Sequence, residues 1–366
     1  MLSDNLMKRS FGLLFSVLTL SGLSAQDTLP PAGLSWSGYV ELYYAFDADQ
    51  PREQNRPPFF YNHHRHNEVN LNLALVQLNY QHLRSRANLG LMAGTYAQTN
   101  LAAEPGLLKN VFEANVGWKI SKKSAWWLDV GIMPSHIGFE SAIGRNNWTL
   151  TRSLCAENSP YYEAGAKLSF TSADERWQGA VLFLNGWQRI QRLPGVQTPS
   201  WGTQLTYTAT PTFTINWSTY TGLEIPDGVQ RRRYFNNLYL LWQPGRWGLT
   251  TGLDAGWQQT ASITTPAARW FTPVCIGRYA WSKALSVSGR WEYYADDQEV
   301  IITTPHGEGF RTQGASVNVD YSPDEHLTLR LEDRALWSDR IIYAVDGRQY
   351  RDNYGMTGAL SYRFGK

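Results

Sequence analysis

Four side chains that could bind a transition metal stand close together near the start of the chain. They are His63, His64, His66 and Glu68. Imidazole nitrogens and a carboxylate are ligands that zinc and copper accept. However, this spacing does not by itself form a closed ligand set, and neighbouring imidazoles at the end of a strand commonly hydrogen-bond adjacent loops instead. We therefore expect no bound metal and no cofactor.

Motifs for hydrolytic chemistry are absent from the sequence. It contains no Gly-x-Ser-x-Gly stretch and no His-Glu-x-x-His helix motif. Cys155 and Cys275 are the two cysteines of the chain, which permits one disulfide without requiring it. Since no catalytic constellation is apparent, we expect that the protein is not an enzyme.

Opposed charges gather in the segment 134–160, which holds Glu140, Arg145, Arg152 and Glu157 around Trp148. Charges of both signs facing each other across a narrow opening would create a transverse field that favours polar or zwitterionic solutes. The alternative is an ordinary solvated loop. Because long connections are commonly functional, we expect this segment to constrict an opening if the surrounding elements form one.

The elements around these residues follow one repeated pattern from Trp36 onward: about ten alternating residues, then a break. In the first segment, Trp36, Val40 and Leu42 share one face, whereas Ser37 and Glu41 share the other. Counting such segments predicts about sixteen β-strands. Their expected spans are 35–46, 68–80, 86–96, 110–121, 126–133, 161–171, 177–186, 201–209, 213–223, 234–243, 247–258, 270–281, 285–294, 310–321, 327–337 and 354–364. The second strand changes phase near Leu75 and Val76, which predicts a bulge.

The breaks alternate between short and long. Short breaks such as Lys122–Ala125 and Pro244–Arg246 have turn chemistry. Every break after an odd-numbered strand is longer: 47–67, 97–109, 134–160, 187–200, 224–233, 259–269, 295–309 and 338–353. This alternation is typical of a barrel with short periplasmic turns and long extracellular loops. We therefore predict an all-β fold, a closed antiparallel transmembrane β-barrel of about sixteen strands.

Closure follows from the chemistry of the membrane, because hydrocarbon offers no partner to an unpaired strand edge. A barrel of sixteen strands is too wide for side chains to fill, so we expect a water-filled lumen. The inward face would then tolerate charges that would be costly toward lipid. The charged residues predicted to line the pore are Glu41, Arg86, Glu113, Lys119, Asp129, Glu163, Lys167, Asp254, Arg290, Glu292, Asp320, Arg330 and Glu332.

Features outside the strands agree with an exported barrel. Lys8 and Arg9 precede an apolar stretch and small residues near Ala25, which predicts a signal peptide over 1–25 and a porin domain over 26–366. The 16 Trp and 20 Tyr are many for a soluble core but suit the two membrane–water boundaries. The aromatic strand that ends near Phe364 is similar to the signal that barrel-assembly machinery reads in bacterial barrels.

Without residues 1–25, the net charge falls from +2 to +1, which predicts no nucleic-acid partner.

Several stretches resemble the OmpL-like β-barrel porin-2 family, which is common in Bacteroidetes-type bacteria. They are Arg56–Glu68, Met92–Gln98, Ser135–Ser141, Ala156–Glu163 and Leu184–Gln191. The resemblance runs from about residue 36 to the end of the chain and implies the fold and an outer-membrane location. It implies no catalytic residue and does not identify a solute.

Together these observations predict an outer-membrane porin that lets small hydrophilic solutes diffuse passively, selected by pore width and lining charge. The expected partners are membrane lipid, lipopolysaccharide, the assembly machinery, the solutes and other copies of the chain in a homo-oligomer. The alternative is a non-conducting barrel that acts as a surface-binding, adhesion or scaffold protein. Arg231, Arg232 and Arg233, in the predicted outward connection 224–233, would either contact lipopolysaccharide phosphates or form a solvated charge run.

Overall fold

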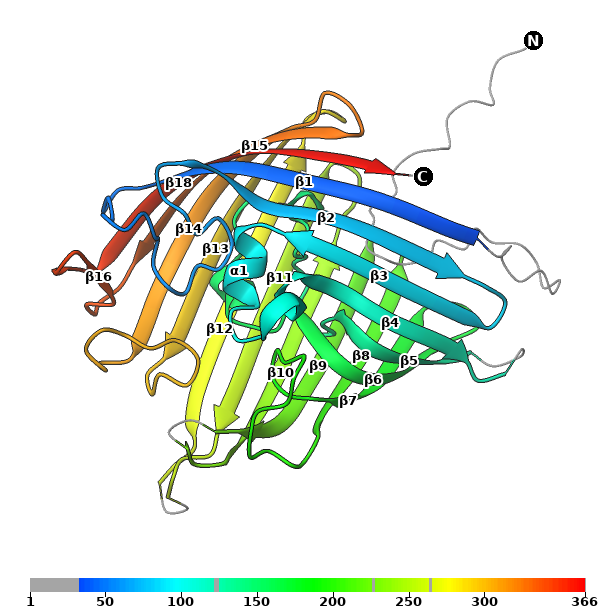
Figure 1. Ribbon diagram of the computed structural model, residues 1–366. Helices are drawn as coiled ribbons and strands as arrows, with labels where there is room; N and C mark the ends of the chain where they lie inside the picture. The colour runs from blue at the N-terminus through cyan, green and yellow to red at the C-terminus, as the bar shows by residue number, and fades with distance from the viewer. Residues whose placement is uncertain (1–32, 122–124, 226–227, 263–264, 366) are drawn as a thin grey trace, which may run out of the picture.

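The computed structural model describes residues 33–121, 125–225, 228–262 and 265–365. In this part of the chain, sixteen long antiparallel strands form one closed barrel (Figure 1). The barrel strands are β1 (Gly33–Asp47), β2 (Val69–Gln81), β3 (Ser85–Ala93), β4 (Val111–Lys119), β5 (Trp126–Pro134), β6 (Tyr162–Thr171), β7 (Trp177–Leu184), β8 (Ser200–Thr210), β9 (Phe213–Glu224), β10 (Arg231–Trp242), β11 (Trp247–Gln258), β12 (Ala268–Ala280), β13 (Leu285–Asp296), β14 (Phe310–Tyr321), β15 (Leu327–Trp337) and β18 (Asp352–Gly365). The predicted fold class and strand number are confirmed.

The first and last strands close the barrel. β1 pairs with β18 from Ser37 opposite Gly365 to Asp47 opposite Gly355, and every other barrel strand pairs with its neighbours in the sequence. The start of β1 and the end of β18 therefore lie at the same end of the barrel (Figure 1). Since the short turns are also at this end, it is the periplasmic end.

The predicted alternation of short and long connections holds with one difference. The connection 225–230 is no longer than the turn 120–125, because β10 begins at Arg231 rather than at residue 234. The three arginines predicted for the outward connection 224–233 are thus the first residues of β10, and Arg233 points inward, where it donates to Gln258. The prediction that they lie in a loop was wrong. A run of three charges is atypical of a strand, but the inward position of Arg233 on β10 accommodates its charge.

Two local features depart from the expected strands. The bulge in β2 lies at Asn72, a few residues before the predicted site, where Glu41 pairs with Leu73 and Leu42 with Leu71. The connection after β15 contains a small hairpin, β16 (Tyr343–Val345) and β17 (Arg348–Tyr350), which pairs apart from the barrel. Strands of three residues give too short an alternation to be recognised in sequence.

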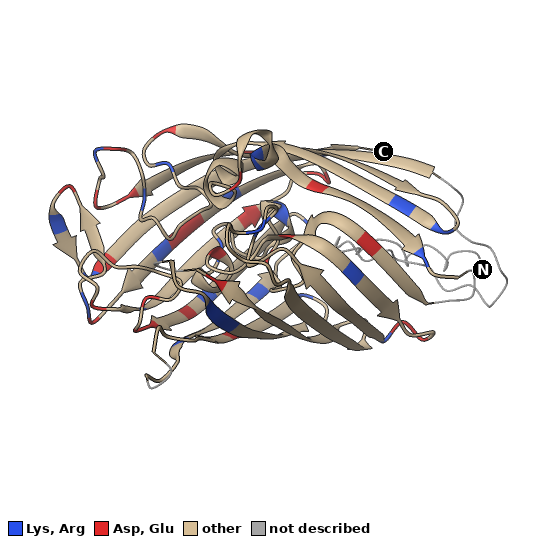
Figure 2. Cartoon of the chain, turned by 60° about the horizontal axis from the view of Figure 1, so that its bottom comes forward, with Lys and Arg blue, Asp and Glu red and all other residues tan. Residues whose placement is uncertain are grey.

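The two faces of the wall differ sharply in chemistry. The outward face carries exposed apolar residues such as Leu42, Leu238 and Leu331, at 40, 47 and 48% exposure. The inward face carries polar and charged residues, and charged positions occur along the strands as well as in the loops (Figure 2). A charge on the lipid-facing side would cost about 2–4 kcal/mol at the bilayer midplane, which explains the separation.

Helices are short in the described residues. They are α1 (Thr95–Asn100), α2 (Leu154–Glu157) and the 3-10 helices Gly106–Asn110 and Gly144–Asn146. In the part of the chain that the structure describes, none of the helices has the length and apolar character needed to cross a membrane. The predicted signal peptide (1–25) and most of the predicted turn at Lys122–Ala125 lie outside the described residues.

Candidate functional site: a long loop folded into the barrel

The connection between β5 and β6, residues 135–161, lies inside the barrel; we call it loop L3. Three of its backbone N–H groups donate to side chains of the inner wall. Leu150 donates to Asn318 (3.1 Å) and Thr151 to Glu332 (2.6 Å), whereas Leu154 donates to Glu292 (2.7 Å). Since these acceptors come from β13, β14 and β15, the middle of L3 rests on that wall.

L3 extends deep into the lumen. The Arg145 guanidinium donates to the backbone oxygen of His326 (2.7 Å), and its backbone N–H donates to the Tyr39 hydroxyl (3.2 Å). His326 belongs to the short turn between β14 and β15, at the periplasmic end. L3 therefore leaves the extracellular end of β5 and reaches the opposite end of the barrel before it returns to β6.

His136 anchors the beginning of L3 to two strands. Its Nδ1 lies 2.8 Å from the Glu163 carboxylate on β6, and its Nε2 lies 2.8 Å from the backbone oxygen of Thr219 on β9. Both contacts are to oxygen acceptors, so both ring nitrogens donate when the imidazole is protonated. Although burial lowers the pKa of His136, the Glu163 carboxylate raises it above its ordinary value. The anchor is thus a buried imidazole–carboxylate contact, which is an ion pair when His136 is protonated.

Glycines of β11 receive the aromatic side chains of L3. A Cβ at Gly248 would lie 2.6 Å from the Trp148 ring, and a Cβ at Gly252 would lie 2.5 Å from the Phe139 ring. Both glycines are inward positions of the same strand. Because any larger side chain would occupy the space of a ring, these two glycines let L3 pack directly against the backbone of the wall.

A network of buried charges fixes the middle of L3. The Arg290 guanidinium donates to the Thr151 backbone oxygen (2.6 Å) and to Glu332 (2.9 Å), while Arg334 donates to Glu292 (2.7 Å). These charged side chains are at most 4% exposed. Buried charges are tolerated only when they are paired and hydrogen-bonded, and here L3 supplies part of the partners.

The four charged residues predicted to form a constriction have different surroundings. Arg152 is fully buried, donates to the backbone oxygens of Ser141, Ala142 and Leu150, and interacts electrostatically with Glu140 and Glu157. Glu140 accepts from Ser153. Arg145 stands apart at the periplasmic end and is only partly buried.

Glu157 links L3 to the first extracellular loop, residues 48–68, which we call L1. Its carboxylate accepts from the backbone N–H groups of Tyr61 (2.9 Å) and Asn62 (3.2 Å). Burial raises the pKa of Glu157 to about 7, although Arg152 and these donors favour the charged form. Three of the four predicted residues therefore hold loops together inside the barrel.

The predicted pore-lining charges fall into two groups, and the first is covered by loops. Glu41 accepts from Tyr39 (2.6 Å) and lies 3.0 Å from His63 of L1. Arg330 donates to the Gly144 backbone oxygen of L3 (2.6 Å) and to Asp320 (2.7 Å). The group covered by loops comprises Glu41, Glu163, Asp254, Arg290, Glu292, Arg330 and Glu332, all at most 4% exposed.

The second group lies on the wall from β3 to β6, away from the part of L3 that rests on β13–β15. Arg86 and Asp129 form a two-bond ion pair at 2.7 and 2.5 Å. Gln77 donates to Glu113 (2.7 Å). Lys119 and Lys167 are partly exposed. Thr206 continues this partly exposed polar wall on β8, whereas the Gln204 side chain of the same strand donates to the His136 backbone oxygen of L3 (2.9 Å).

Aromatic side chains from several loops pack together in the extracellular half of the barrel. Phe59 of L1 lies 4.9 Å, between ring centroids, from Phe310 of β14. Trp187, from the connection 185–199, lies 5.0 Å from Tyr220 and 4.9 Å from Phe235. The cluster also includes Tyr343 of β16. The extracellular mouth is therefore narrowed by an apolar cluster of loop and wall residues.

The histidines of the segment 63–68 point to different partners. His63 contacts Glu41, His64 contacts the Phe60 backbone oxygen (3.0 Å), and His66 accepts from the Asp47 backbone N–H (2.9 Å). Glu68 pairs with Arg65 (2.9 Å). In the described residues, no group of three or more His, Cys, Asp or Glu side chains is arranged to hold a metal ion. Cys155 and Cys275 are not bonded to each other.

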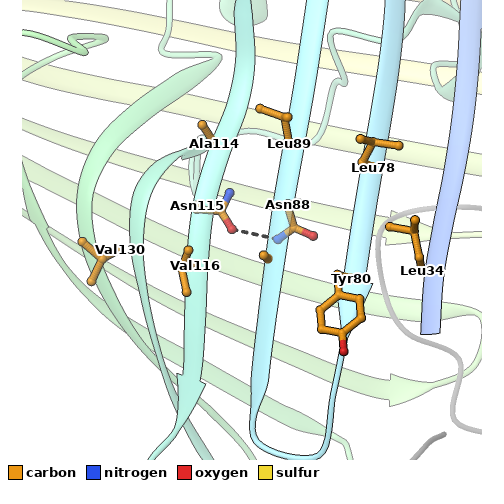
Figure 3. Close-up of a pocket in the computed structure, with 10 residues that line it drawn as sticks. Leu34, Leu78, Tyr80, Asn88, Leu89, Ala114, Asn115, Val116 and Val130 are labelled. Atoms are coloured by element: carbon orange, nitrogen blue, oxygen red, sulfur yellow. Dashed lines mark hydrogen bonds between the residues drawn. The ribbon is translucent and has the colours of Figure 1, made fainter. Parts of the chain in front are cut away.

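A hollow of about 400 Å³ lies on the outside of the wall between β1 and β5 (Figure 3). Exposed apolar side chains line it, among them Leu34 (65% exposed) and Val116 (63%). Asn88 and Asn115 hydrogen-bond each other beside it at 2.7 Å. Because its lining is apolar and faces outward, this hollow belongs to the lipid-facing surface rather than to the site in the lumen.

Sequence reasoning missed the residues that position L3. His136, Gly248 and Gly252 were not selected, because a lone histidine and scattered glycines carry no signal without the fold. The sequence does contain one sign of a packed loop. Glycine occurs at positions 248, 252 and 256 of one strand, and an inward face without side chains at these positions leaves room for another segment.

The chain matches the family described as "Putative beta-barrel porin-2, OmpL-like" over residues 33–364. Its structure is similar to those of an anion-selective porin from Comamonas acidovorans and the outer membrane channel DcaP of Acinetobacter baumannii. The identities are 10 and 11%, the TM-scores are both 0.61, and the matches cover 91 and 93% of this chain and 100% of each porin.

A third similar structure is OmpT of Vibrio cholerae in its trimer form, at 8% identity and a TM-score of 0.58, covering 91% of this chain and 99% of that one. At these identities the likeness concerns the fold. No curated protein matches the sequence.

Proposed function

This chain belongs to the OmpL-like β-barrel porin-2 family and is a porin of the bacterial outer membrane, and we propose that small hydrophilic solutes diffuse through it passively. The observation that carries the proposal is the contrast between the two inner walls. L3 covers the wall of β13–β15, whereas the wall from β3 to β8 keeps partly exposed polar side chains. Water and solutes would pass along this second wall.

We propose further that L3 narrows the passage. Its depth supports this role, because the loop reaches the periplasmic end through Arg145. The buried residues Glu140, Arg152 and Glu157 would keep the loop in shape. Arg86 and Lys167 on the opposite wall are partly exposed and would then supply the charges that a passing solute meets, while the buried Asp129 carboxylate pairs with Arg86. The ion pair and the neighbouring ammonium place both signs of charge along this wall, which suits polar and zwitterionic solutes.

The finer expectations from the sequence remain part of this proposal. They are export by a signal peptide over 1–25, insertion by the barrel-assembly machinery, contact with lipopolysaccharide, assembly into a homo-oligomer and a source among Bacteroidetes-type bacteria. The closed barrel with an apolar exterior supports the first three, since such a chain must cross one membrane and be inserted into another. We also propose that the chain has no enzymatic activity.

A second candidate function is a non-conducting barrel that binds a partner or supports a complex at the cell surface. The aromatic cluster in the extracellular half favours it, because Phe59, Trp187 and Tyr343 fill space that an open mouth would leave to water. The porin is the better supported of the two functions, because a sealed barrel would not require partly exposed polar side chains along the wall from β3 to β8.

Liposome swelling separates the two functions. The refolded full chain is reconstituted into vesicles, which are diluted into neutral and zwitterionic solutes of increasing size. A porin gives swelling rates that fall steeply with solute size. Rates equal to those of protein-free vesicles for the smallest solute would contradict the porin proposal and favour the non-conducting barrel.

A further inference from the structure

A recess of about 140 Å³ lies between L3 and the wall of β9–β12, close to the periplasmic end. L3 contributes Phe139, Trp148 and Asn146 to its lining, and the short turns of the barrel contribute Thr212 and Gln243. Thr212 is exposed, so the recess is close to periplasmic solvent. Sites for drug-sized ligands measure ~300–1,000 Å³, so this recess suits a single small ring.

The aromatic residues of the recess are held firmly. Trp148 packs on the backbone at Gly248, and Phe139 packs on Gly252 and lies 5.7 Å from the Tyr239 ring. Both side chains are only partly buried. A fixed aromatic ring offers a flat apolar surface to a ligand at little cost in side-chain entropy.

Polar groups of the recess are available for a ligand. Among the described residues, none hydrogen-bonds the side-chain amides of Asn146 and Gln243 or the indole N–H of Trp148. An amide both donates and accepts, and an indole N–H donates. These groups would recognise hydroxyl groups, which also donate and accept.

The charge of the lining excludes several classes of ligand. No lysine or arginine lines the recess, so a phosphate or carboxylate would find no cation there. Glu140 is the charged residue of the lining, and the backbone N–H and hydroxyl of Ser153 already donate to its carboxylate. A neutral ligand fits this lining better than an ion of either sign.

We infer that this recess is a binding site for a neutral sugar ring, because apolar C–H faces match the aromatic rings and hydroxyl groups match the free amides. The inference rests on the proposed function in one respect, since it names sugars as a solute class of the channel. Trp148 and Phe139 would contact the ring, while Asn146 and Gln243 would bind its hydroxyl groups.

Isothermal titration calorimetry of the refolded full chain with maltose tests the inference. We expect saturable binding that weakens at least tenfold in Trp148→Leu and several-fold in Gln243→Ala. Trp217→Leu is the matched control, because Trp217 faces lipid and is 49% exposed. Heat-dependent gel migration shows whether each variant keeps its barrel. Choline, a small cation, serves as the comparison ligand.

The outcomes distinguish this inference from the porin proposal. If vesicles swell but maltose does not bind, or binds equally to Trp148→Leu, the sugar site is refuted and the porin stands. If maltose binds as expected but vesicles do not swell, the site stands and the channel proposal fails. Binding of choline in preference to maltose would overturn the inference, since Glu140 would then be the recognising group.

Discussion

At the scale of single residues, the lumen is organised by buried charges that need the loop to be satisfied. Glu292 and Glu332 accept backbone N–H groups of L3, and Arg290 donates to the same stretch of loop. Leaving a buried charge unpaired costs several kcal/mol. The charges on this wall therefore act as attachment points for L3 more than as groups that meet solutes.

His136 makes the attachment dependent on pH. Although burial lowers the pKa of His136, Glu163 raises it above its ordinary value in the folded protein. The contact with Glu163 therefore stabilises the folded position of L3 fully below about pH 6.5, the ordinary pKa of histidine. This stabilisation of L3 is lost as the pH rises through the higher folded-state pKa. We expect L3 of the wild-type protein to become several-fold more sensitive to protease between pH 6 and pH 9. Limited proteolysis of the refolded barrel measures this change.

Two variants control that experiment. His136→Ala should be protease-sensitive at every pH, whereas His326→Ala, which changes a half-exposed histidine in a periplasmic turn, should behave like the wild type. Equal sensitivity of wild type and His136→Ala at pH 6 would show that the ion pair with Glu163 does not hold the loop.

At the scale of elements, β11 is shaped to receive L3. Gly248 and Gly252 leave room for Trp148 and Phe139, so the ring positions depend on the absence of two side chains from the strand. Tight packing of this kind tolerates added volume poorly.

Gly252→Val should displace L3 without opening the barrel. The new side chain would overlap the Phe139 ring, at an expected cost of about 1–3 kcal/mol. We expect larger single-channel steps in this variant, because the loop would pack less closely on the wall. Gly277→Ala is the control, since a Cβ at Gly277 meets no atom within 4 Å. Identical steps in Gly252→Val and wild type would contradict the role of the glycine slots.

The strands could be predicted from sequence because each is long enough to show its alternation, and lipid on one side makes that alternation strict. The sixteen spans differ from those observed by a few residues, and β10 differs because Arg233 is accommodated within the barrel. The site could be predicted less well. Sequence spacing indicates that Arg152 and Glu157 lie in one long loop, but only the folded barrel shows that they bond backbone groups instead of facing an opening.

At the scale of the whole molecule, closure between β1 and β18 determines whether the barrel exists. Without β18, the backbone groups of β1 and β15 along this seam would be unpaired in hydrocarbon, where each costs several kcal/mol. The small hairpin of β16 and β17 pairs outside this ring.

Deleting residues 352–366 should therefore abolish insertion into lipid vesicles. Replacing residues 343–350 by a flexible linker of equal length should leave a barrel that still migrates faster on gels before heating than after. Retention of this heat-dependent migration after loss of β18 would show that closure by this strand is dispensable.

The central claim is a conducting barrel that L3 narrows, and single-channel recording of the refolded wild type and of a variant lacking residues 138–157 tests it most directly. The deletion removes most of L3 and leaves the sixteen strands intact. We predict open-channel steps for the wild type and clearly larger steps for the deletion variant. Steps of equal size would contradict narrowing by L3, and silence of both proteins would contradict the channel itself.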